Sequence, residues 1–235
     1  MVDIKPENIR RQYRNPEGED GRTVLEGMNE HHVPIWECCL ASMPKVVDGT
    51  VMDIGCGGGG LIARLSQRYP YAQLVGVDIS QESLDMTAKV NCGLIDDGRL
   101  SLHRCSVDDM PLADGSVDVI TAVETYFFWP DLTEALAEIH RVLSPGGRVF
   151  IGSEMQLRDD NAKEMERASE LYYTRLVRDE VMLDLMRGVG FDARAVSEDG
   201  TDMVVFIGCK NMEPHIARHR IVMDIPTFGD LPDYY

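Results

Sequence analysis

The stretch that decides the fold is Val51–Gly60, which reads VMDIGCGGGG. Its first residues belong to a short apolar segment, Thr50–Ile54, that is typical of a buried strand. Glycine lets the backbone turn tightly and approach a ligand closely, so the stretch predicts a nucleotide-cofactor loop at the end of a strand. Gly55, Gly57 and Gly60 also satisfy the dinucleotide pattern GxGxxG, which is weak when it stands alone.

Segments typical of strands and helices alternate on the carboxyl side of this loop. Further strands are expected over Gln73–Asp78, Leu100–Cys105, Val117–Val123, Arg148–Ser153, Phe191–Ser197 and Asp202–Cys209, with helices over Gly57–Tyr69, Gln81–Ile95, Leu132–Leu143, and roughly 160–176 and 178–189. This alternation predicts an α/β protein with a doubly wound, mostly parallel sheet. Only four residues, Glu198–Thr201, join the last two strands, so these should pair antiparallel.

The length of 235 residues suits a single domain. We expect an N-terminal cap segment over residues 1–43, a Rossmann-like core over 44–210 and a C-terminal tail over 211–235. Within the cap, residues 15–21 indicate a loop, and 23–42 have a loosely helical pattern that breaks near Pro34. The tail has no clear periodicity, so a lid, a dimer arm and a surface wrap all stay open, as do a monomer and a homodimer.

The composition of the chain indicates which classes of partner it is expected to bind and which it is not. Asp and Glu number 40 against 23 Lys and Arg, giving a formal net charge of −17, which would repel the phosphates of a nucleic acid. No apolar run is long enough to cross a membrane and the first residues do not form a signal peptide, so a cytoplasmic protein with a small-molecule substrate is expected. The six cysteines are scattered and no Cys/His set has zinc-ligand spacing, so no metal is expected.

Two aspartates bear on the choice of cofactor, and of these Asp53 discriminates whereas Asp78 alone does not. Asp53 lies two residues before the first glycine, where it would repel the pyrophosphate of a dinucleotide. It suits S-adenosylmethionine instead, because that cofactor has a cationic ammonium and a cationic sulfonium and no phosphate there. Asp78 ends the next strand and can accept hydrogen bonds from both ribose hydroxyls, as the corresponding residue of an NAD site does.

These motifs, together with Cys105–Asp118 and Ile139–Ile151, resemble the class I S-adenosylmethionine-dependent methyltransferase family. The resemblance covers about residues 44–210 and includes the Pro145-Gly146-Gly147 turn. It implies a three-layer, seven-stranded sheet of order 3-2-1-4-5-7-6 with strand 7 antiparallel. The front end, with Arg14-Asn15-Pro16 and Met28-Asn29-Glu30-His31, resembles a small-molecule-type subgroup with an N-terminal helical cap.

The resemblance also implies the cofactor-binding residues. These are Asp53, Gly55, Cys56, Gly57 and Gly59 in and before the loop, Asp78 and Ile79 after the second strand, Ser106 and Val107 after the third, and Glu124 after the fourth. The family usually has Gly-Asp-Ala after the third strand, whereas this chain has Cys105, Ser106 and Val107. Adenine recognition is therefore expected to depend more on the Val107 backbone or on Asp108.

The acceptor side should follow the fourth strand, since ligands of doubly wound folds bind at the carboxyl ends of strands. Glu124 is a candidate base there, and Tyr126, Phe128 and Trp129 are candidates for an apolar acceptor wall. His31 is a second candidate base on the cap, and His32 a candidate substrate residue. Solvated or packing roles are the competing interpretations of all six.

The expected function is methyl transfer from S-adenosylmethionine to a small-molecule acceptor by in-line displacement, with S-adenosylhomocysteine as the product. An NAD-type oxidoreductase is the alternative from another enzyme class, and a non-catalytic S-adenosylmethionine-binding protein is the third. The acceptor, its nucleophilic atom and the use of a general base stay open.

Overall fold

The computed structural model describes residues 6–211, and seven strands form one sheet. Their order is β3-β2-β1-β4-β5-β7-β6, and β7 is antiparallel to both of its neighbours, as expected from the sequence. The bounds are β1 Thr50–Ile54, β2 Gln73–Asp78, β3 Leu100–Arg104, β4 Val117–Val123, β5 Leu143–Ser153, β6 Phe191–Ser197 and β7 Val204–Lys210.

Helices cover both faces of the sheet because successive strand residues point to opposite sides. Val51 of β1 packs in one apolar cluster with residues of α3 (Val33–Ser42), α4 (Gly60–Arg68) and α5 (Gln81–Val90). Met52, the next residue, packs in a second cluster with residues of α7 (Leu132–Val142) and α9 (Asp179–Gly188). The three-layer α/β architecture is therefore confirmed.

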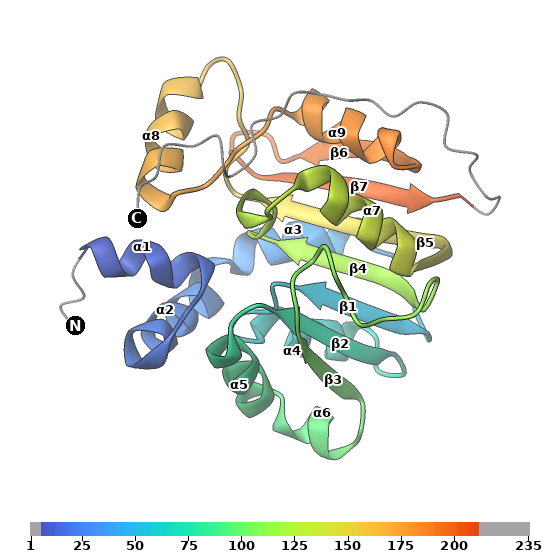
Figure 1. Cartoon of the computed structure of the whole chain (residues 1–235). Coiled ribbons are helices and arrows are strands. Elements are labelled where there is room, and N and C mark those ends of the chain that lie inside the picture. Colours follow the sequence, from blue (N-terminus) through green and yellow to red (C-terminus); the bar gives the residue numbers. More distant parts are fainter. Residues whose placement is uncertain (1–5, 212–235) are drawn as a thin grey trace.

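The remaining helices gather at one end of the sheet. Figure 1 shows α1 (Pro6–Arg14), α2 (Gly18–His31) and α8 (Ala162–Tyr172) at the end toward which β1, β4 and β5 point. Helix α1 contacts both α2 and α8, and the rings of Tyr13 and Tyr172 meet edge to face with centroids 5.3 Å apart. These contacts with distant segments pack a helix that is rich in polar and charged residues.

Several expected boundaries were wrong for local reasons. Helix α2 begins at Gly18, inside the expected loop over 15–21. Helix α4 begins at Gly60, because Gly57 and Gly59 have φ values of 50° and 78° that a right-handed helix excludes. The Pro145-Gly146-Gly147 turn lies in an irregularity of β5, between the register pairs Val117–Leu143 and Val119–Arg148.

The helix expected over Gln81–Ile95 is divided at Asn91 into α5 and α6 (Cys92–Asp96). The Asn91 side-chain amide donates to the carbonyls of Gly59 and Thr87, each at 3.0 Å. The residue at which this helix breaks is therefore hydrogen-bonded to the glycine loop.

The C-terminal tail falls almost wholly on residues 212–235, which lie outside the described residues. Among residues 6–211, none of the helices combines the length and the apolar composition that crossing a bilayer requires.

Ile120 tests the central packing. It is fully buried in β4, so Ile120→Ala is expected to lower the free energy of unfolding by about 2–5 kcal/mol. Urea denaturation measures this, with Val46→Ala, at an 82% exposed position, as the control. Equal effects of the two substitutions would contradict the assignment of β4 to the core.

Candidate functional site

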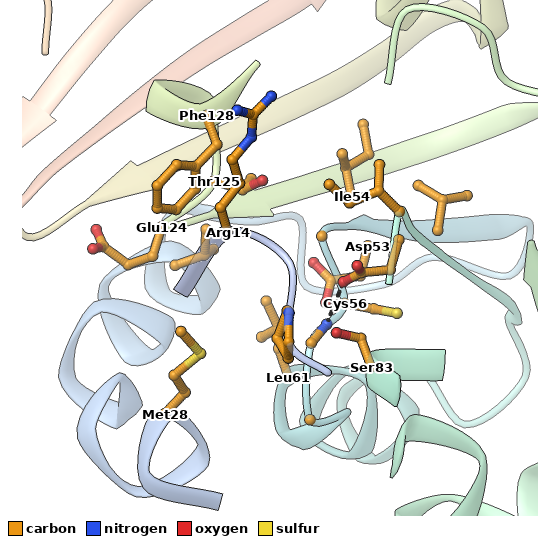
Figure 2. Close-up of a pocket in the computed structure, with 18 of the residues that line it drawn as sticks. Arg14, Met28, Asp53, Ile54, Cys56, Leu61, Ser83, Glu124, Thr125 and Phe128 are labelled. Carbon is orange, nitrogen blue, oxygen red and sulfur yellow. Dashed lines mark hydrogen bonds between the residues drawn. The ribbon is translucent and has the colours of Figure 1, made fainter. Parts of the chain in front are cut away.

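A pocket opens at the carboxyl ends of β1 and β4, where the strand order changes direction. This is the place where doubly wound sheets bind ligands. Tyr13, Arg14, Met28 and Asn29 line it from the side of α1 and α2. Figure 2 shows Glu124 and Met28 on one side of the cavity and Asp53, Cys56 and Ser83 on the other.

The glycine loop lies against the pocket because two of its residues exclude side chains. Gly55 has φ 69°, and a Cβ there would come within 2.7 Å of the Thr125 hydroxyl oxygen. Gly57 has φ 50°, a conformation that L-residues rarely adopt. Gly55, Cys56 and Gly57 all line the pocket, in agreement with their expected place, and burial raises the pKa of the Cys56 thiol well above its usual value.

Gly59 does not line the pocket. It is the N-cap of α4 in a left-handed conformation, and a Cβ on it would meet Asn91 and Thr87 at 2.7 and 2.8 Å. The expectation that Gly59 contacts the cofactor is corrected to a packing role, since close approach of α5 requires glycine here.

Asp78 lies at the end of β2 and lines the pocket. Its Oδ2 accepts a hydrogen bond from the Gly57 amide at 3.0 Å, and its Oδ1 accepts one from the Ser80 amide at 2.9 Å. Burial raises the pKa of this carboxyl, whereas the backbone hydrogen bonds lower it in part. Because each carboxylate oxygen accepts more than one bond, Asp78 can hold the loop and still accept from a ribose.

Asp53 is 3% exposed in β1 and lines the floor of the pocket. The Thr121 hydroxyl donates to its Oδ1 at 2.7 Å. Burial raises the pKa of Asp53 to about 7, with Asp78 contributing in the same direction. A cation in the pocket would favour the ionised form of this carboxyl.

The opposite rim near β2 and β3 has the residues expected around adenine. Ile79, Ser106 and Val107 line the pocket together with Cys105. Ile79 is 39% exposed, and an apolar side chain so exposed beside a pocket is available to cover a flat ring. Asp108, the alternative partner considered for adenine, is not among the lining residues.

Glu124 follows β4 with φ 56°, a strained value for a residue other than glycine. Its Oε1 accepts a hydrogen bond from the Glu154 amide at 2.6 Å, and its own amide donates to the Gly152 carbonyl at 2.9 Å. Burial raises the pKa of Glu124 to about 8. These hydrogen bonds hold the backbone in this conformation and keep the carboxyl in the pocket wall.

Of the aromatic residues expected to face the acceptor, two line the pocket and one is buried in the core. Phe128 and Trp129 line the pocket, as expected. Tyr126 is 1% exposed and packs in the core with Phe127 and Phe206. The structure therefore does not bring Tyr126 to the cavity, because its ring is buried in the core from the short helix η1 (Tyr126–Phe128).

The two cap histidines also differ. His32 lines the pocket, and burial together with neighbouring His31 lowers its pKa to about 4. The His31 side chain is 77% exposed and does not line the pocket, so the structure does not bring this candidate base to the cavity. Its Nε2 lies 3.7 Å from Oε2 of Glu154.

Two further residues of this region were missed in the sequence. Asn29 donates from its amide to the Gly58 carbonyl at 2.9 Å and accepts from the Gly60 amide at 3.2 Å, which joins α2 to the loop. Glu154 directly follows β5, beside Glu124. Glu154 had a detectable signal, since it occupies at the end of β5 the place that Glu124 occupies at the end of β4.

Comparison with known proteins finds methyltransferases that are similar to this chain in sequence and in fold. Residues 52–151 match the family model described as a methyltransferase domain. Residues 52–151 therefore resemble the methyltransferase domain that the sequence motifs indicated, and the chain shares the fold of class I methyltransferases. The cofactor and enzyme class expected from Asp53 and Asp78 are those of the family.

A malonyl-[acyl-carrier protein] O-methyltransferase of Dechloromonas aromatica is similar to this chain, at 34% identity over 114 residues. That match covers 47% of this chain and 38% of the relative. The chain spans 38% to 54% of the length of the first curated relatives it matches.

Two solved structures share the fold. One is the Haloferax volcanii putative methyltransferase in complex with the Trm112 activator, with TM-score 0.71, 21% identity and coverage of 86% of this chain and 97% of that one. The other is geranyl diphosphate C-methyltransferase from Streptomyces coelicolor with Mg²⁺, geranyl diphosphate and S-adenosylhomocysteine bound. It has TM-score 0.68, 15% identity and coverage of 88% and 98%.

Asp78 supplies a direct test of the cofactor site. Asp78→Ala is expected to weaken S-adenosylhomocysteine binding by about 1.5–3 kcal/mol, the scale of hydrogen bonds to a charged group. Calorimetric titration measures this, and Asp85→Ala, at an exposed position of α5, is the matched control. An Asp78→Ala protein with a normal melting temperature and unchanged affinity would show that Asp78 does not contact the ribose.

Proposed function

We propose that this methyltransferase transfers the methyl group of S-adenosylmethionine to a small-molecule acceptor bound beside β4 and β5. The observation that carries the proposal is that one cavity has two chemically different ends. Asp78 and the loop amides lie at the β1–β2 end, whereas Glu124, Phe128 and His32 line the other end. A cofactor across the loop has its sulfonium between the two ends.

Residue roles follow from this placement. Gly55, Cys56 and Gly57 allow close approach of the methionine and ribose, Asp78 accepts from the ribose, and Ile79, Ser106 and Val107 enclose adenine. Phe128 and Trp129 supply an apolar wall that excludes water from the reacting atoms. His32 closes the acceptor side from the cap.

The reaction is an in-line displacement at the methyl carbon. A lone pair of the acceptor forms the new bond while the carbon–sulfur bond breaks, and the electron pair stays on sulfur to give neutral S-adenosylhomocysteine. Positioning supplies much of the rate. Where the acceptor has a proton to lose, the Glu124 carboxylate takes it, and its pKa of about 8 suits a base that works near neutral pH.

The acceptor's nucleophilic atom is not specified by similarity. The relatives include proteins named as O-methyltransferases and others named as C-methyltransferases. The N-terminal helices favour a small acceptor. Tyr13, Arg14 and Met28 of these helices line the cavity and limit the space through which an acceptor can enter.

Transfer itself is tested with methyl-labelled S-adenosylmethionine and fractionated metabolites from a cell extract. Label is expected in a small-molecule fraction, and Glu124→Gln is expected to reduce its rate by about 10²–10⁴-fold if the acceptor must lose a proton. Label only in protein or nucleic acid fractions would contradict the proposal. Tight binding of NAD, with none of S-adenosylhomocysteine, would restore the oxidoreductase alternative.

A pH dependence follows from Glu124. S-adenosylmethionine has a sulfonium charge that S-adenosylhomocysteine lacks, and this charge favours the ionised carboxyl. Preference for S-adenosylmethionine should therefore strengthen as the pH rises toward about 8 and level off above it. The gain is about tenfold for each unit by which the sulfonium lowers the pKa. Calorimetry with both ligands across this range measures it, and a slope that persists in Glu124→Gln would assign the effect to another group.

A further inference from the structure

Three side chains from distant parts of the chain converge at the acceptor end of the pocket. His32 comes from the junction of α2 and α3, Glu124 from the end of β4, and Glu154 from the residue after β5. One ligand atom of each, an imidazole nitrogen and two carboxylate oxygens, lies within 4.8 Å of the other two. All three residues are partly buried.

Within the described residues, no hydrogen bond joins the converging side-chain atoms of these three residues to one another. Glu124 Oε1 accepts a hydrogen bond from the Glu154 amide at 2.6 Å, which fixes the position of the carboxylate in the pocket wall. Among residues 10–211, neither ring nitrogen of His32 has a hydrogen bond, and its ring is oriented by an edge-to-face contact with Trp36. Two carboxylates and an imidazole therefore share a small volume, with His31 Nε2 3.7 Å from Glu154 Oε2 and Arg14 lining the same pocket.

We propose that His32, Glu124 and Glu154 bind one divalent transition-metal ion of the Zn²⁺ or Mn²⁺ type beside the methyl acceptor. One imidazole with two carboxylates is a donor set that such ions accept. Ligand bonds to nitrogen and oxygen are about 2.0–2.2 Å long, so two ligands of one ion lie up to about 4 Å apart. The present spacing requires only a small movement of flexible glutamate side chains.

The donor set favours a metal ion over an organic ammonium, because imidazole is the commonest metal ligand among protein side chains. The protein's net charge of −17 adds a general attraction for cations.

The ion has a use that rests on the proposed function. Three protein ligands leave coordination positions open, and an oxygen of the acceptor can take one of them. Such an ion would lower the pKa of a coordinated hydroxyl, so that its proton passes to solvent and Glu124 serves as a ligand in place of the base described above, and it would hold the oxygen opposite the sulfonium. The acceptor class implied is therefore an oxygen-bearing metabolite, such as a hydroxyl, an enol or a carboxylate compound.

Metal binding is testable without any methyl transfer. The full chain is stripped with a chelator and desalted, then titrated by calorimetry with Zn²⁺ or Mn²⁺ alone, and with Co²⁺ alone by visible absorption. One ion per chain is expected, and both His32→Asn and Glu154→Gln should lower the affinity by about tenfold or more. Glu134→Gln, at an exposed position of α7, is the matched control and should bind as the unchanged protein does.

Other outcomes overturn the proposal. These are no stoichiometric binding of any of the three ions, an unchanged affinity in folded His32→Asn and Glu154→Gln, or binding of methylammonium by a protein that takes no metal. Titration of the metal-free protein with S-adenosylhomocysteine is a separate measurement. Cofactor binding without metal binding contradicts the metal site alone, whereas loss of both contradicts the proposed function as well.

Discussion

The site depends on the hydrogen bond between the Gly57 amide and the Asp78 carboxylate. It joins the glycine loop after β1 to the end of β2, and the amides of Gly55 and Cys56 extend this contact by donating to the Val77 carbonyl. The loop can lie so close to β2 only because Gly55 and Gly57 adopt positive φ angles. Asn29 and Asn91 then brace the same loop from α2 and from the α5–α6 junction.

Electrostatics of the pocket follow from that packing. Asp53, Asp78 and Glu124 lie in the walls of one cavity, and burial raises the pKa of each. A pocket with several buried carboxyls favours a cationic ligand, because a positive charge restores their ionised forms. S-adenosylmethionine has that charge at its sulfonium, whereas the pyrophosphate of NAD would add negative charge to the same place.

The parts of the fold that were predicted are those encoded locally. Alternating apolar segments and the short link at Glu198–Thr201 indicated the sheet and its antiparallel strand, and Asp78 was recognisable by its place at the end of β2.

Helix α1 was not predictable, because its packing partners on α8 are about 160 residues away in the chain. The burial of the Tyr126 ring was not predictable for a similar reason, because the turn of η1 that buries it depends on tertiary packing. Glu154 lies beside Glu124 because β4 and β5 pair in parallel, whereas His32 reaches them through the packing of the N-terminal helices, which is not encoded locally.

The most direct test is a crystal structure of the protein with S-adenosylhomocysteine bound. The ribose hydroxyls should hydrogen-bond to Asp78, the adenine should lie between Ile79 and Val107, and the sulfur should face the side of Glu124 and Phe128. A ligand bound with its ribose away from Asp78, or with its sulfur directed toward β3, would contradict the division of the pocket into a cofactor end and an acceptor end.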